Sequence, residues 1–143
     1  METTTERALL EGFEHTTLPG LAHRDHVHLA WLYLRREPLW SALPRFCADL
    51  KRFAAQAGAP QRYHETITWA YFMLVHERRE GRPAEESWDT FAIANPDLLC
   101  WQPSVLDRYY KKETLDSERA RRRFILPDLG VGSGLLSVVY EKP

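Results

Sequence analysis

Residues 21–36 read LAHRDHVHLAWLYLRR, and this stretch decides the expected fold. A helix with one buried stripe carries apolar residues at positions i, i+3, i+4 and i+7. That spacing holds here for Val27, Ala30, Trp31 and Leu34. Leu29 and Leu32 place further apolar side chains on the opposite side. We therefore expect a helix that is apolar nearly all round and that lies at the centre of a bundle.

The flanking sequence predicts further helices on both sides of this one. Apolar periodicity and terminal signals place them at residues 5–12, 39–57, 62–80 and 84–94. Gly58 is expected to end the helix over 39–57, and Pro44 fits that helix only within its first turn. Asn95 is expected to cap a short helix that begins at Pro96.

The C-terminal third predicts shorter elements. Helical pieces are expected at 104–113 and 117–124, the second capped by Asp116 or Ser117. The stretch LLSVVY in the tail favours an extended strand or a docked arm. The prediction is an all-α, single-domain helical bundle with short irregular C-terminal helices, a core over 13–128 and a tail over 129–143.

Composition excludes several classes of protein. The 143 residues carry a net charge of −1, so no overall field attracts nucleic acid or an anionic membrane. The N-terminus has no signal-peptide pattern, and no apolar run reaches the roughly 18 residues of a membrane span. Cys47 and Cys100 stand beside bulky apolar neighbours and are expected to be buried free thiols. The expected location is the cytoplasm.

Histidines are the most informative side chains. His23 and His26 are spaced i, i+3 on the predicted helix, so their imidazoles can converge on one point, whereas His28 lies on another face. His64 begins the helix over 62–80 and supplies a third imidazole if the two helices pack face to face. The alternative is that these are core histidines satisfied by threonine, tyrosine and backbone partners.

Three neutral imidazoles with an open fourth position suit a metal. The predicted ligands of one transition metal (Fe, Zn or Cu) are His23, His26 and His64. Glu65 and Asp25 are expected to orient a ring, or one of them is itself a ligand in a two-histidine, one-carboxylate Fe(II) site. Thr68 lies one turn beyond His64 and can hydrogen-bond the same ligand.

The strings FEHTTLPGLAHRDHVHLAWLYL, YHETIT and RYYKKETLDSERARRRFILPD resemble a family of small all-helical bacterial proteins, often encoded near small-molecule biosynthesis genes. The resemblance covers most of 13–128 and supplies no activity. Its pattern is matched by His23, His26, Trp31, His64, Thr66, Thr68, Tyr109, Tyr110, Arg121 and Asp128. Ala22 stands where the family has an aromatic residue, and Lys111 where it has serine.

The C-terminal motif suits the other wall of a pocket. One of Tyr109 and Tyr110 is expected to face inward as a proton donor or substrate contact. Arg121 either binds a substrate carboxylate or pairs with Asp128 to pin the C-terminus. The predicted catalytic residues are His64, Glu65, Thr68 and Tyr109, and the predicted substrate-binding residues are Trp31, Tyr110 and Arg121.

Three functions are consistent with these residues. The first is a small metalloenzyme that acts on a small organic molecule. The second is a metal-free enzyme with His64 or His23 as general base. The third is a ligand-binding or partner-binding module without chemistry. Phosphate loops and dinucleotide fingerprints are absent from the sequence, so no nucleotide cofactor is indicated. A homodimer is a further expectation.

Overall fold

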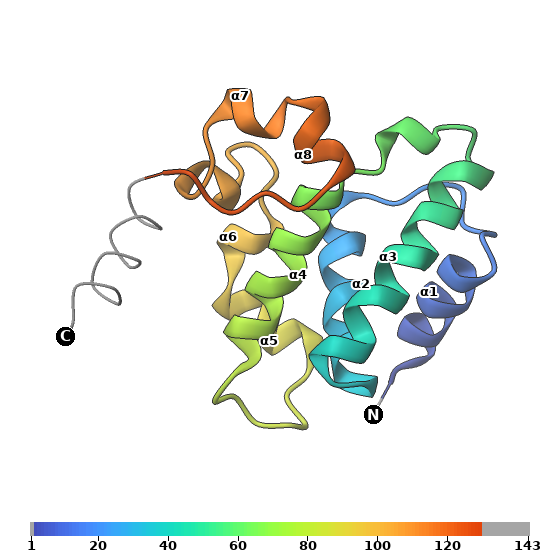
Figure 1. Cartoon of the computed structure of the whole chain (residues 1–143). Coiled ribbons are helices and arrows are strands. Elements are labelled where there is room, and N and C mark those ends of the chain that lie inside the picture. The colour runs from blue at the N-terminus through green and yellow to red at the C-terminus, as the bar shows by residue number, and fades with distance from the viewer. Residues whose placement is uncertain (1, 130–143) are drawn as a thin grey trace.

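The computed structural model describes residues 2–129, which form ten helical segments and no strand (Figure 1). The long helices are α1 (Thr4–Glu14), α2 (His23–Arg36), α3 (Leu39–Gln56) and α4 (Glu65–Arg79). The shorter elements are η1 (Pro60–Arg62), α5 (Trp88–Ala94), α6 (Pro96–Leu99), η2 (Val105–Arg108), α7 (Lys112–Leu115) and α8 (Glu118–Arg122). The predicted strand or arm at LLSVVY lies outside the described residues.

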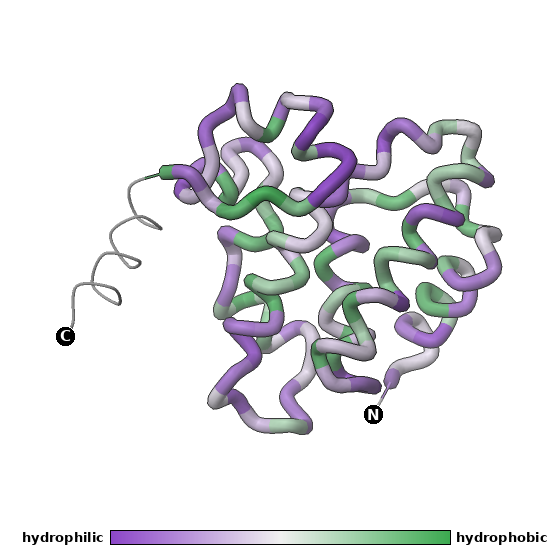
Figure 2. Tube along the Cα trace, in the orientation of Figure 1, coloured by the Kyte–Doolittle hydropathy of each residue, from purple (hydrophilic) through white to green (hydrophobic). Residues whose placement is uncertain are grey.

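Helix α2 is the centre of the bundle, as its sequence predicts. Val27 and every residue of 29–34 are buried. The helix packs against α3, α4 and α6, so apolar neighbours surround it on several sides. Figure 2 shows the apolar stretches of these helices turned toward one another and the polar stretches at the rim. The all-α single-domain prediction is confirmed.

Several helix ends follow the expected capping chemistry. Thr3 and Glu6 form a reciprocal capping box at the start of α1, with 3.0 Å hydrogen bonds to each other's backbone N–H groups. Gly58 ends the α3 region with a φ of +75°, a left-handed conformation that costs glycine little. Ser117 caps α8 by accepting a hydrogen bond from the N–H group of Ala120.

Two local predictions are wrong, and a third is confirmed only in part. Pro44 lies in the second turn of α3 and not in its first. The missing N–H leaves the carbonyl of Trp40 without its helical donor, and this is tolerated because Trp40 is exposed. Asn95 is the N-cap residue of α6, which begins at Pro96 as expected, but its side chain donates to the carbonyl of Phe91 and does not bond to the start of the helix. Cys100 is exposed, while Cys47 is buried as expected.

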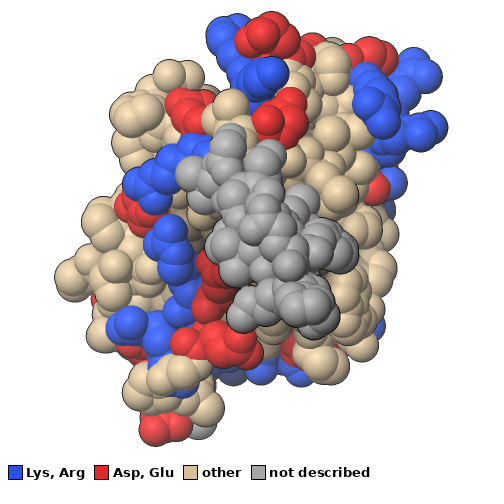
Figure 3. All heavy atoms as spheres, turned by 60° about the vertical axis from the view of Figure 1, so that its left-hand side comes forward, with Lys and Arg blue, Asp and Glu red and all other residues tan. Residues whose placement is uncertain are grey.

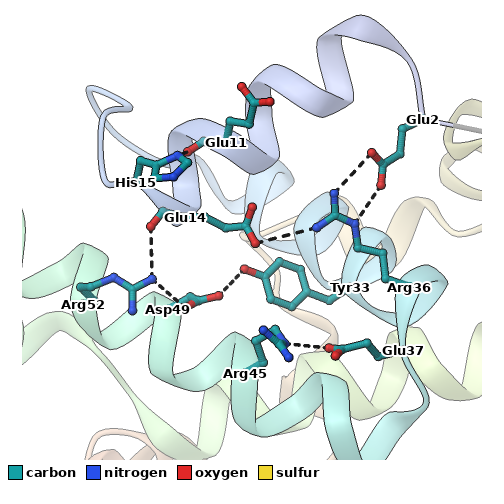
Figure 4. Close-up of polar contacts among 10 residues, drawn as sticks. All are labelled: Glu2, Glu11, Glu14, His15, Tyr33, Arg36, Glu37, Arg45, Asp49 and Arg52. Atoms are coloured by element: carbon teal, nitrogen blue, oxygen red, sulfur yellow. Dashed lines mark hydrogen bonds and ion pairs between the residues drawn. The ribbon is translucent and has the colours of Figure 1, made fainter.

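A polar network ties the first three helices together (Figure 4). The Tyr33 hydroxyl on α2 donates to Asp49 on α3 at 2.6 Å, and Asp49 also accepts from Arg52 at 2.7 Å. Arg52 reaches the backbone carbonyl of Glu14 at the end of α1. Burial and the Asp49 carboxylate raise the pKa of Tyr33, so this phenol stays protonated. Its partners satisfy the buried carboxylate, and the network is structural.

The C-terminal segments cover one end of α4. Helix α8 packs against α4, and α7 packs against α8, so both lie over the N-terminal turn of α4 (Figure 1). Arg78 near the other end of α4 binds Asp97 on α6 through two hydrogen bonds of 2.9 and 3.0 Å. Within the described residues, no helix is both long enough and apolar enough to cross a membrane.

Candidate functional site

His64 is fixed through both of its ring nitrogens. It is the N-cap of α4, where Nδ1 accepts a hydrogen bond from the N–H group of Ile67 at 3.1 Å. Nε2 donates to the backbone carbonyl of Leu115 at 2.7 Å. These two bonds together require the neutral tautomer with the proton on Nε2. Neither nitrogen is left for a metal or a substrate proton, so the predicted ligand and catalytic roles of His64 do not fit this arrangement.

His23 and His26 form a pair apart from His64. His23 Nε2 donates to the carbonyl of Leu98 at 2.8 Å, and its ring stands edge-on to Tyr71 with centroids 4.7 Å apart. Burial lowers the pKa of His23. Burial first, and the neighbouring His23 second, lower the pKa of His26 to about 4. Both rings are therefore neutral near pH 7.

The side chains do not fit the predicted metal centre. Among residues 2–129, no three His, Cys, Asp or Glu side chains are grouped so that they could hold a metal ion. Asp25 accepts a hydrogen bond from the backbone N–H group of Ala22 at 2.9 Å, and Glu65 accepts one from the Tyr63 hydroxyl at 2.6 Å. The two carboxylates are therefore occupied locally and do not orient a metal ligand.

His28 has a structural role on another face, consistent with its predicted separation from His23 and His26. Its Nε2 donates to the Glu6 carboxylate at 2.8 Å and so links α2 to α1. The His28 ring stacks on Trp88 with centroids 4.1 Å apart and an interplanar angle of 8°. Burial outweighs the carboxylate and lowers the pKa of His28.

The two threonines of the YHETIT motif bind backbone groups. Thr66 is fully buried; its hydroxyl donates to the carbonyl of Arg123 at 2.7 Å and accepts from the N–H group of Ile125 at 3.1 Å. Thr68 donates to the carbonyl of His64 at 2.7 Å, within its own helix. Thr66 thus fastens the C-terminal segment to α4. The predicted contact between Thr68 and a ligand is not found.

The tyrosine pair is also used in fastening. The Tyr110 hydroxyl donates to the carbonyl of Ile125 at 2.6 Å, and burial raises the pKa of Tyr110 to about 12. The backbone carbonyl of Tyr109 accepts from the N–H groups of Asp128 and Leu129, both at 3.1 Å. The Tyr109 side chain lies in a separate, smaller apolar groove of about 170 Å³. Tyr109 does not line the larger hollow described below, so the predicted role of proton donor to a substrate has no support there.

Arg121 and Asp128 do not pair with each other. Arg121 binds Glu118, three residues before it, with one hydrogen bond of 2.8 Å from Nε. Asp128 accepts from the N–H group of Lys111 at 3.0 Å and from the Thr114 hydroxyl, and these hydrogen bonds lower its pKa. The predicted Arg121–Asp128 contact is wrong. Asp128 does pin the C-terminal segment, through other partners.

Trp31 lies in the core. It is 1% exposed and packs against Trp88 and Phe91, with the guanidinium groups of Arg35 and Arg79 over its ring at 4.9 and 5.8 Å. It is not among the residues that line the hollow described next. The predicted contact between Trp31 and a substrate is therefore not found in this fold.

The larger of two hollows lies where the start of α4 meets the C-terminal segments, and its volume is about 850 Å³. Of the predicted site residues, His64, Tyr110 and Arg121 line it. His23, His26, Glu65, Thr68 and Tyr109 do not. Its apolar lining comes from Ile67, Trp101, Leu106, Leu115 and Leu129. Its charged lining comes from Asp107, Lys111, Lys112, Glu113, Asp116, Glu118 and Arg121.

Sequence reasoning missed the wall formed by residues 101–107. Trp101, Ser104 and Asp107 all line the hollow. The Ser104 side-chain oxygen lies 2.7 Å from the Tyr71 hydroxyl and accepts from the N–H group of Leu106 at 3.1 Å. The sequence feature that could have indicated this wall is a tryptophan beside polar residues and Pro103. It was weaker than the histidine pattern because no second motif accompanied it.

Charges of both signs surround this part of the molecule. Figure 3 shows acidic and basic side chains interspersed on one face, without a large area of one sign. Lys112 pairs with Asp116 at 2.6 Å, and Arg122 pairs with Glu118 at 2.7 Å.

Comparison of the chain with protein-family models, with curated proteins and with solved structures found no match.

Proposed function

We propose that this protein is a small-molecule-binding domain whose site is the hollow between α4, the 101–107 loop and α7–α8. The observation that carries the proposal is the hollow itself. Its volume of about 850 Å³ lies within the range of roughly 300–1,000 Å³ for small-molecule sites. Five apolar side chains offer a ligand an apolar surface of the kind that such sites share. The other lining residues are polar or charged.

The occupied side chains favour binding over chemistry. His64 uses both ring nitrogens on backbone groups, and Tyr110 uses its hydroxyl in the same way. Ser104 is hydrogen-bonded to Tyr71 and to a backbone N–H group, and no histidine of the described chain donates to it or accepts from it. A serine without a neighbouring base is a weak nucleophile.

A metal-free enzyme is the second candidate function. His23 favours it, because Nε2 donates to the carbonyl of Leu98 and the other ring nitrogen is then an acceptor. The His23 ring lies 5.1 Å from the ring of Trp101, which lines the hollow. In this candidate His23 is the general base, and His23→Gln abolishes turnover while the fold is kept. Unchanged turnover in His23→Gln contradicts it.

A pair of variants on α4 tests the binding proposal. Ile67 and Met73 are both half-buried, but only Ile67 lines the large hollow, whereas Met73 lines the smaller groove. A set of small organic metabolites is screened for compounds that raise the melting temperature. Such compounds are expected to stabilise the wild type and Met73→Trp and to lose their effect on Ile67→Trp, where the new ring fills the hollow. Either an absence of stabilising compounds or equal stabilisation of Ile67→Trp contradicts the proposal.

A further inference from the structure

Trp101 is an unusually exposed aromatic side chain. Trp101 lines the hollow and is 46% exposed. Two aromatic rings pack against it from within the fold. The His23 ring lies 5.1 Å from it and the Tyr71 ring 6.4 Å from it, centroid to centroid. An indole held in this way offers its electron-rich face to a ligand without having to be ordered first.

Two of the three cations that line the hollow are paired with carboxylates. Lys112 pairs with Asp116 at 2.6 Å, and Arg121 pairs with Glu118. Lys111 binds Asp128 only through its backbone N–H group, at 3.0 Å, and its ammonium group has no ion-pair partner within residues 2–129. The positive charges of Lys112 and Arg121 are therefore largely neutralised by their own neighbours.

Asp107 is the contrasting case. It lines the same hollow as Trp101 and lies in η2, six residues further along the chain. Its carboxylate has neither an ion-pair partner nor a side-chain hydrogen bond within residues 2–129. Its negative charge also helps to raise the pKa of Tyr71, which lies behind the loop. The wall formed by residues 101–107 is thus acidic and aromatic at once.

We propose that the hollow takes a small organic amine in its protonated form, with an apolar body. The ammonium group lies between the Asp107 carboxylate and the Trp101 ring, where charge attraction and a cation–π contact add. The apolar body lies against Ile67 and Leu106, which also line the hollow. This inference rests on the proposed binding function and names the ligand class for it.

Three probes of similar size and shape but different charge test whether the charge of the ligand determines its affinity. Phenethylamine is cationic near pH 7, phenethyl alcohol is neutral, and hydrocinnamate is anionic. Binding is measured by titration calorimetry at constant ionic strength. The amine is expected to bind about tenfold more tightly than the alcohol, and the acid more weakly than both.

Two variants with the same change in net charge localise the effect. Asp107→Asn is expected to lower the affinity for the amine about tenfold and to leave the affinity for the alcohol unchanged. Asp89→Asn, on the exposed start of α5 and outside the hollow, is expected to leave all three affinities unchanged.

The outcomes also separate this inference from the function on which it rests. Equal binding of the three probes, preferred binding of the acid, or an unchanged affinity for the amine in Asp107→Asn overturns the amine proposal. Failure of the amine to bind overturns it as well. If other small molecules still stabilise the wild type but not Ile67→Trp, the binding function stands without it. If no small molecule does so, both proposals fall.

Discussion

The bundle of α1–α4 and the C-terminal region over 96–129 are held together in different ways. The four long helices have 11 to 18 residues and bury most of the apolar core between them. Helices α6, α7 and α8 have only four or five residues each, well below the length at which a helix is stable alone. The C-terminal region therefore depends on its attachments to α4.

Those attachments are mostly single side chains that bind backbone groups. His64 binds the carbonyl of Leu115, and Thr66 binds both Arg123 and Ile125. Within the C-terminal region itself, Tyr110 binds the carbonyl of Ile125. Buried polar groups must be paired, so a few well-placed hydrogen bonds help to fix this region in place, together with the buried side chains of Leu98 and Leu106. The motif that suggested chemistry thus serves to position the wall of the hollow.

The largest expected effect on stability comes from a substitution in the apolar core of the α1–α4 bundle. Phe72 on α4 is fully buried, whereas Phe124 is half-buried against Trp69 at 5.1 Å. Phe72→Ala is expected to lower the free energy of unfolding by about 3–5 kcal/mol, because it leaves a cavity in the core. Phe124→Ala is expected to lower it by about 1–2 kcal/mol. Urea denaturation measures both, and equal losses contradict the division into two regions.

Acid is expected to weaken the bundle through its half-buried histidines. The pKa of His26 is about 4 in the folded state, against 6.5 for an ordinary histidine. Between these values the unfolded chain binds more protons, so stability falls as the pH falls through this window. The shift predicts a loss of about 2 kcal/mol between pH 7 and about pH 5. The pKa values of His23 and His28 are lowered too and act in the same direction.

Replacement of His26 tests this pH dependence. Urea unfolding is measured across the window for His26→Leu and for His76→Gln, in which a histidine in the last turn of α4 is replaced. A flatter profile in His26→Leu and an unchanged profile in His76→Gln are expected. If both variants keep the wild-type slope, His26 is not the group that responds to acid.

Thr66 and Thr68 offer a matched pair on one helix. Thr66→Val removes a donor and an acceptor that join α4 to residues 123 and 125, and it is expected to cost about 2 kcal/mol. Thr68→Val removes only a bond within α4 and is expected to cost under about 1 kcal/mol. Hydrogen exchange of the Ile125 amide is expected to accelerate only in Thr66→Val. Similar losses in the two variants contradict the fastening role of Thr66.

Tyr110→Phe is expected to have a smaller effect than Thr66→Val. The variant keeps the buried ring and removes the hydroxyl that donates to Ile125 at 2.6 Å. The expected loss is about 1 kcal/mol, seen as a lower melting temperature and faster exchange in the C-terminal region. A melting temperature equal to that of the wild type shows that this hydrogen bond does not hold the region.

The sequence predicts the bundle well because periodicity carries the information. The apolar residues of 21–36 place α2 at the centre, and Gly58 and Ser117 mark helix ends by their own backbone or side-chain chemistry. Pro44 breaks these local rules, and Asn95, although it is the N-cap residue of α6, uses its side chain for another contact. At both positions a contact made in the folded protein, or exposure to water, outweighs the local preference.

The partners of the candidate site residues could not be predicted in the same way. His23, His64 and Thr66 bind carbonyl groups that lie 75, 51 and 57 residues away in the sequence. Every residue carries a backbone carbonyl, so no residue type marks such a partner in advance. A histidine that binds a distant carbonyl and one that binds a metal therefore look alike in the sequence, and only the fold separates them.

The protonation of the His64 ring is the most direct test of the claim that His64 holds the C-terminal region and binds no metal. Nitrogen-15 NMR of the histidine side chains identifies which ring nitrogen carries the proton, and a scalar coupling across the hydrogen bond identifies its acceptor. We expect a neutral His64 with the proton on Nε2, a coupling to the carbonyl of Leu115, and no change in the ring signals on addition of Zn²⁺. A proton on Nδ1, or a His64 ring whose signals shift on addition of Zn²⁺, would contradict it.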